Sequence, residues 1–267
     1  MTVRDKLWLF GVRPHQDDIW LGRNRGQGPL TGYRSRITPA EGALMLDVPN
    51  MAMIVCDGEP ATFSDEAYGY AESFCRMKQV LWGASGSNGY RCGNEEQFIV
   101  ELSRRYPNIT GAYLDDIIGD RPEDEVLALL ARSRQELDRA DRHLDMIATW
   151  YFRKKASPQV LAALDGVTLC SWRQEELDQL EENFERIEAQ CTHQKKILLC
   201  YLFDFPSGLP VTEERMAHQC EYGLQLLRQG RIDGMMFEAN SVMGVGLPSE
   251  LWLRRWLEQV KDTPVPD

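Results

Sequence analysis

Residues 197–239, ILLCYLFDFPSGLPVTEERMAHQCEYGLQLLRQGRIDGMMFEA, contain the pattern that decides the fold. The apolar stretch Ile197–Phe203 predicts a strand, and an amphipathic helix is expected to begin at Thr212 and end at Gly230, a residue suited to a helix C-cap. A second apolar strand is predicted over Gly234–Ala239. A strand, a helix and another strand in this order are typical of a parallel sheet, because the helix carries the chain back to the starting edge.

The same unit recurs along the whole chain. Six further strands are predicted, each followed by a helical segment: Leu7–Val12, Met51–Cys56, Gln79–Ala84, Gly111–Ile118, Leu144–Tyr151 and Gly166–Trp172. An open dinucleotide-binding sheet would carry a glycine-rich turn after its first strand, and Gly11-Val-Arg-Pro-His-Gln-Asp17 does not fit that pattern. The sequence therefore predicts one α/β domain over residues 1–267, a (β/α)8 TIM barrel.

The bulk composition narrows the range of partners. The chain has 267 residues, 43% of them hydrophobic, and a formal net charge of −11, which argues against nucleic acid or an anionic membrane as a partner. Its seven cysteines contain no C-x-x-C pair and suggest reduced core residues. Neither a signal peptide nor a membrane-spanning stretch is recognisable, so we expect a cytoplasmic protein.

Two of the predicted strands share a frame that ends in an acid. Gly111-Ala-Tyr-Leu-Asp115 and Gly234-Met-Met-Phe-Glu238 each place a carboxyl four residues after a glycine. Side chains alternate between the two faces of a strand. If Leu114 and Phe237 pack against the helices, Asp115 and Glu238 point into the barrel near its top.

Chemistry in this fold lies at the carboxyl ends of the strands, and the residues predicted there are rich in acids and aromatic rings. A pair of carboxyls suits glycosidic cleavage, in which one protonates the leaving oxygen while the other attacks or activates water. We expect Asp115 and Glu238 to be this catalytic pair, with Asp116 as a substitute for either. The residues expected to bind substrate are Arg13, His15, Asp57, Trp150, Trp172, Tyr201, Asp204 and Asn240.

The run Tyr113-Leu-Asp-Asp116 at the end of the fourth predicted strand resembles the TIM-barrel glycoside hydrolases, several families of which place a catalytic acid there and another on a later strand. The resemblance covers the architecture of the chain and only a few residues of motif. It implies a small-molecule or oligosaccharide substrate and no cofactor. The chain lacks the Asn-Glu pair of the largest clan and the D-x-x-D-x-D-x-E run of chitinase-like barrels, so no specific family is matched.

Two other functions remain open. A metal-dependent barrel enzyme acting on a small polar metabolite would use His15, Asp17, Asp57 and Glu238. With one histidine at the predicted mouth, we do not expect a metal. A non-catalytic barrel that binds carbohydrate or a protein partner is the other alternative.

The predicted barrel has a long connection after its first strand, from Pro14 to Ile37. A connection of this length in a compact domain is often a lid or a binding loop, and a packed crossing segment is the alternative. Its arginines stand among glycines, at Arg23, Arg25, Arg34 and Arg36.

Overall fold

The computed structural model describes residues 1–21, 34–119, 121–154 and 157–266. It confirms the predicted TIM barrel: eight parallel strands form a closed ring in the order β1-β10-β7-β6-β5-β4-β3-β2. The ring closes because β1 pairs with both β2 and β10. The strands are β1 (Leu7–Gly11), β2 (Asn50–Met53), β3 (Gln79–Ser85), β4 (Ile109–Leu114), β5 (Asp145–Tyr151), β6 (Gly166–Cys170), β7 (Lys195–Tyr201) and β10 (Gly234–Glu238).

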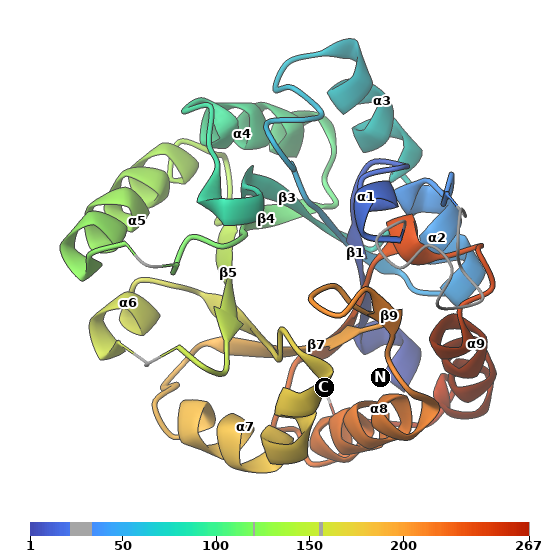
Figure 1. Ribbon diagram of the computed structural model, residues 1–267. Helices are drawn as coiled ribbons and strands as arrows, with labels where there is room; N and C mark the ends of the chain where they lie inside the picture. The colour runs from blue at the N-terminus through green and yellow to red at the C-terminus, as the bar shows by residue number, and fades with distance from the viewer. Residues whose placement is uncertain (22–33, 120, 155–156, 267) are drawn as a thin grey trace.

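Helices surround the strands as an outer layer (Figure 1). The helices that follow the strands are α2 (Pro39–Leu46), α3 (Asp65–Ser73), α4 (Glu95–Arg105), α5 (Glu123–Leu137), α6 (Pro158–Ala162), α7 (Leu180–Glu188), α8 (Glu213–Arg228) and α9 (Pro248–Val260). Short 3-10 turns are η1 (Val3–Lys6), η2 (Ser87–Gly89), η3 (Gln174–Gln179) and η4 (Asn240–Val242). Where the sequence predicted one strand through Phe203, β7 ends earlier, and β8 (Phe203–Asp204) pairs with β9 (Leu209–Pro210) in a separate antiparallel hairpin.

The long connection after β1 contains the short helix α1 (Asp18–Leu21). The lid or plug expected there falls mainly on residues 22–33, including Arg23 and Arg25, which lie outside the described residues. Of the other two arginines, Arg34 lies 3.8 Å from the carboxylate of Asp18, and Arg36 lies 3.6 Å from that of Glu41.

Local signals in the sequence set the ends of two helices. Thr38 and Glu41 form a capping box at the start of α2, in which the Thr38 hydroxyl accepts from the Glu41 amide at 3.2 Å and the Glu41 carboxylate accepts from the Thr38 amide at 2.8 Å. Gly230, just after α8, has a φ of +67°, which glycine adopts without a Cβ penalty.

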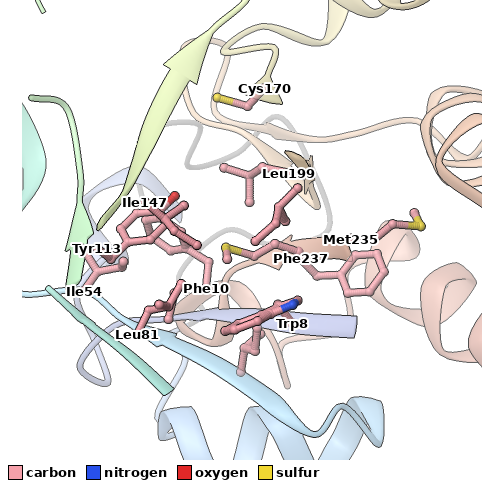
Figure 2. Packing of buried hydrophobic residues seen from close by; sticks show 14 of the residues in the cluster. Trp8, Phe10, Ile54, Leu81, Tyr113, Ile147, Cys170, Leu199, Met235 and Phe237 are labelled. Atoms are coloured by element: carbon pink, nitrogen blue, oxygen red, sulfur yellow. The ribbon is translucent and has the colours of Figure 1, made fainter. Parts of the chain in front are cut away.

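Apolar side chains fill both the barrel interior and the layer between strands and helices (Figure 2). Phe10 meets Tyr113 edge to face inside the barrel, with ring centroids 5.9 Å apart. Met235, by contrast, faces α8, because a Cβ built on Gly223 of that helix would lie 2.5 Å from its terminal methyl carbon. Phe237 shares the facing of Met235, so Glu238 points into the barrel, as the alternation predicted.

No helix in the described part of the chain is both long and apolar enough to cross a membrane.

Candidate functional site

Asp115 and Glu238 lie at the carboxyl ends of strands that face each other. Asp115 follows β4 directly, and Glu238 is the last residue of β10. In the closed ring of strands, β4 and β10 are separated by three strands in either direction, so they are diametrically opposite. Both side chains therefore approach the barrel axis at the mouth from opposite walls.

Asp115 is a buried carboxyl held by one hydroxyl. It is 6% exposed, and the Thr149 hydroxyl donates to its Oδ1 at 2.8 Å. The Thr149 oxygen also lies 3.0 Å from the Tyr113 hydroxyl, which is 2.6 Å from the hydroxyl of Thr168. The pKa of Asp115 is raised to about 8, mainly by burial and then by the nearby charge of Asp116, while the Thr149 hydrogen bond lowers it.

Glu238 is a buried carboxyl, one oxygen of which is unpartnered within the described part of the chain. It is 9% exposed, and its Oε2 has no hydrogen-bond partner among the described residues. Burial raises the pKa of Glu238 well above its ordinary value, and the charges of Asp115 and Asp17 add to the shift. Only the hydrogen bond from Tyr201 opposes these effects, so Glu238 retains its proton strongly.

A third carboxyl, Asp17, completes the acidic cluster. The Ser241 hydroxyl donates to its Oδ2, which links the segment before α1 to η4. Burial raises the pKa of Asp17 to about 6, and the Ser241 hydrogen bond opposes the shift. Because Asp17 also acts on the pKa of Glu238, the cluster formed by Asp17, Asp115 and Glu238 cannot hold three negative charges at neutral pH.

Asp116 lies at the rim of the mouth, next to this cluster. Its φ of +51° turns the backbone out of the strand direction, and its side chain is half-buried. The Tyr151 hydroxyl donates to Asp116 Oδ1 at 2.9 Å, and the Asn88 amide donates to Oδ2 at 2.9 Å. Asp116 therefore connects the mouth to the loop that follows β3.

Aromatic rings form one wall of the mouth. Trp172 is stacked on Phe205, with centroids 5.8 Å apart and an interplanar angle of 4°. Tyr151 and Tyr201 meet Trp172 edge to face at 6.2 and 6.0 Å. Trp172 and Tyr151 are half-buried, so parts of both side chains remain accessible from the mouth.

Two residues expected to bind substrate, Trp150 and Asn240, have structural roles instead. Trp150 is fully buried, and since Thr149 and Tyr151 face the mouth, its ring faces the helices. The Asn240 amide, also fully buried, exchanges 2.8 Å hydrogen bonds with the backbone of Val12 and donates to another carbonyl. Both predictions are corrected, because these side chains are structural.

Asp204 is likewise engaged in its own loop. It is 2% exposed, and its Oδ2 accepts from Ser207 at 2.8 Å and from Gln174 at 3.2 Å. These contacts tie the β8–β9 hairpin to η3. The expected role of Asp204 in substrate binding is corrected to one in shaping the loop.

The remaining predicted residues lie on the rim. Arg13 is 3.6 Å from the carboxylate of Glu59, and His15 is exposed and lies 3.1 Å from that of Asp18. Asp57 is exposed and lines a groove beside the mouth. The four residues of the alternative metal site do not come together in the structure, since His15 and Asp57 lie outside the acidic cluster.

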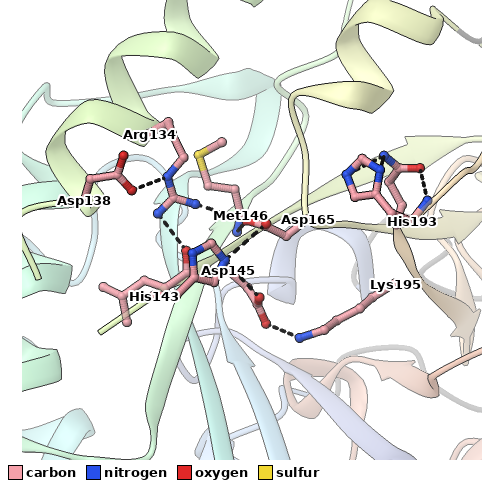
Figure 3. Close-up of polar contacts among 10 residues, drawn as sticks. Arg134, Asp138, His143, Asp145, Met146, Asp165, His193 and Lys195 are labelled. Atoms are coloured by element: carbon pink, nitrogen blue, oxygen red, sulfur yellow. Dashed lines mark hydrogen bonds and ion pairs between the residues drawn. The ribbon is translucent and has the colours of Figure 1, made fainter. Parts of the chain in front are cut away.

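The described residues contain one group of potential metal ligands, and it lies at the other end of the barrel (Figure 3). His143, Asp145 and Asp165 are at or just before the amino ends of β5 and β6. Lys195 lies 2.5 Å from Asp145, and Arg134 lies 3.1 Å from Asp165. Two cations already neutralise these carboxylates, so we assign this group to fold stability.

No protein-family profile matches the sequence, and no curated protein is detectably similar to it. Solved structures do resemble the fold. A GH99 endo-alpha-mannosidase from Bacteroides thetaiotaomicron has a TM-score of 0.62 and 10% identity over 96% of this chain and 97% of that one. A family 17 beta-1,3-glucanosyltransferase from Rhizomucor miehei has a TM-score of 0.55 and 10% identity over 75% and 79%.

A dihydrodipicolinate synthase from Rhodopseudomonas palustris is similar too, with a TM-score of 0.50 and 11% identity over 97% of this chain and 76% of that one. Glycoside hydrolases are prominent among the similar structures, but the identities are so low that the similarity shows the barrel fold alone. Function has to be argued from the site.

Several residues of the site were not found from the sequence as contributors to catalysis or binding. Thr149 and Ser241 donate to the carboxyls, and Phe205 carries the stacked Trp172. Burial raises the pKa of the Cys56 and Cys170 thiols, and the nearby carboxylate charges raise it as well. The position of each cysteine at a strand end was the available signal.

Proposed function

We propose that the protein hydrolyses a glycosidic bond at the mouth of the barrel, with Glu238 as proton donor and Asp115, the first of the two carboxyls to ionise, as its partner. The observation that carries the proposal is the placement of two buried carboxyls on opposite strands beside an aromatic wall. Glycosidic cleavage needs one protonated and one ionised carboxyl on either side of the bond. Accessible aromatic surface provides a contact for the apolar face of a sugar ring.

The difference between the two environments assigns the roles. When two carboxyls repel each other, one ionises first and the other keeps the shared proton. The Thr149 hydroxyl stabilises the ionised form of Asp115, whereas Glu238 Oε2 has no partner among the described residues. Glu238 is therefore the group that can protonate a leaving oxygen, and Asp115 attacks the anomeric carbon or activates water.

Asp17 has a supporting role in this proposal. Its charge raises the pKa of Glu238, so an ionised Asp17 helps to keep the proton donor protonated. Asp116 remains at the rim, where its hydrogen bonds with Tyr151 and Asn88 favour an orienting role.

The test is turnover by carboxyl-to-amide variants on β-1,3-glucan, chitin and mannan oligosaccharides, measured as released reducing ends. Asp115→Asn and Glu238→Gln are each expected to lower kcat by at least about a hundredfold, the usual contribution of a positioned acid or base. The midpoint temperature of thermal unfolding at pH 7 should be unchanged or higher in both variants, because an amide resembles the neutral carboxyl that the fold favours.

The matched control is Asp145→Asn. Asp145 is the first residue of β5, so it lies at the amino ends of the strands, away from the mouth. The control should retain wild-type turnover. Equal loss in the control and the two site variants, or turnover that survives in both Asp115→Asn and Glu238→Gln, would contradict the assignment.

A further inference from the structure

A groove of about 660 Å³ runs beside the mouth, outside the acidic cluster. The loop after β3 forms one wall, α5 forms the other, and Asp57 closes one side. Its volume lies within the range of small-molecule sites. The residues that line it are Asp57, Ser87, Asn88, Gly89, Tyr90, Arg91, Arg121, Glu125, Ala128, Leu129 and Arg132.

One hydrogen bond links the groove wall to the rim of the mouth. The Asn88 backbone amide, in the groove wall, donates to Asp116 Oδ2 at 2.9 Å. The other oxygen of Asp116 accepts from Tyr151 of the aromatic wall. Asp116 therefore joins the groove wall to the mouth, and a chain of sugar units held at Asp115 and Glu238 would have to cross it to reach the groove.

The loop backbone holds Tyr90 in place while its ring stays exposed. Gly86 donates to the Tyr90 carbonyl at 3.0 Å, and the Tyr90 amide donates to Ser87 at 3.3 Å. The ring edge lies against Gly58, where an added Cβ would be 2.9 Å from a ring carbon. Tyr90 is 49% exposed, so the loop presents an aromatic surface that is already fixed before any ligand arrives.

Arg121, which lies just before α5, lines the groove as well, and hydrogen bonds hold its side chain in place. Its guanidinium donates to the carbonyl of Gly89 at 2.8 Å, and a Cβ on Gly89 would lie 2.6 Å from one of its nitrogens. Arg132 is exposed further along α5, and the exposed carboxyls of Asp57 and Glu125 stand in the same groove. Cations and anions are both present, so the groove suits a neutral ligand whose groups donate and accept.

We propose that this groove binds additional units of a neutral oligosaccharide whose scissile bond lies at Asp115 and Glu238. Sugar hydroxyls both donate and accept, as the mixed charges of the groove require, and the exposed Tyr90 ring offers a stacking surface for a pyranose. This inference rests on the proposed glycosidase function and specifies its substrate as a chain longer than a disaccharide.

The test measures binding by titration calorimetry, so that it does not depend on turnover. The probes are laminarihexaose, chitohexaose and mannohexaose, the corresponding disaccharides, and hexagalacturonate as an anionic hexasaccharide. For at least one neutral series, the hexasaccharide should bind wild-type protein about tenfold more tightly than the disaccharide. Tyr90→Ala should reduce that ratio to about one, because an aromatic contact contributes about 0.5–1.5 kcal/mol, up to tenfold in Kd.

Two further variants separate stacking from general damage. Tyr90→Phe keeps the ring and should keep the length dependence. Arg228→Ala removes an exposed arginine from α8, away from the groove, and should leave every Kd unchanged.

The groove assignment is overturned if no hexasaccharide binds more tightly than its disaccharide, if Tyr90→Ala retains the ratio, or if hexagalacturonate alone binds. Failure of the groove and failure of the catalytic assignment are distinguishable. Oligosaccharide turnover without length dependence refutes the groove, whereas length-dependent binding without turnover refutes hydrolysis.

Discussion

Replacing Thr149 with valine removes the hydroxyl that donates to Asp115 and changes little in side-chain shape. Thr149 is 2% exposed, so water cannot readily replace the lost donor. A hydrogen bond to a charged group contributes about 1.5–3 kcal/mol, and one pKa unit corresponds to about 1.4 kcal/mol. Since the bond stabilises the ionised carboxylate, Thr149→Val should raise the pKa of Asp115 by about one to two units.

The direct measurement is a ¹³C NMR titration of the aspartate carboxyls, with the Asp115 signal assigned by its absence in Asp115→Asn. If Asp115 must be ionised for turnover, the acidic limb of the kcat/KM profile should move to higher pH by the same amount. The expected cost in stability at pH 5 is about 1 kcal/mol, because Asp115 is then neutral and only a neutral hydrogen bond is lost.

Thr168→Val is the control, since Thr168 contacts Tyr113 in the same network but does not touch Asp115. It should leave the Asp115 titration nearly unchanged. A shift below about half a unit in Thr149→Val, or an equal shift in both variants, would refute the view that this hydroxyl sets the ionisation of Asp115.

Two further predictions concern stability. The folded-state pKa of Asp17 is raised to about 6, so the folded protein keeps a proton that the unfolded chain loses near pH 4. The free energy of unfolding should therefore fall by up to about 3 kcal/mol between pH 4 and pH 7, and urea unfolding of Asp17→Asn should lack this part of the slope. Asn240→Ala should lower the free energy of unfolding in urea by about 2–4 kcal/mol, because it leaves the buried backbone groups of Val12 and the half-buried carbonyl of Ile37 without their partner; a cost below about 1 kcal/mol would contradict its structural role.

The structure explains why a glycine precedes an acid by four residues at both β4 and β10. Gly111 is the third residue of β4 and Gly234 is the first residue of β10, and at each of them a neighbouring backbone comes very close. A Cβ would lie 2.4 Å from the carbonyl oxygen of Asp145 at Gly111, and 2.8 Å from that of Lys6 at Gly234. Both positions therefore favour glycine, and the acid four residues later falls on the same inner face of its strand.

The wrong predictions for Trp150 and Asn240 have different causes. Trp150 and Tyr151 are adjacent at the end of β5, yet a strand sends neighbouring side chains to opposite faces, so only one of them reaches the mouth. Asn240 lies two residues after Glu238, but its side-chain amide forms hydrogen bonds with the backbone of Val12, 228 positions away. Such partners are invisible to local pattern.

The sequence by itself determined the barrel, because alternating strands and amphipathic helices leave few ways to bury their apolar faces. It also placed Asp115 and Glu238 at inward-facing strand ends. Only the tertiary structure decided which other groups surround them. The pairing of Asp115 with Thr149, the approach of Asp17 and the exposed ring of Tyr90 depend on elements far apart in the chain. Ionisation follows from burial and from neighbouring charge, and both exist only once the barrel has closed.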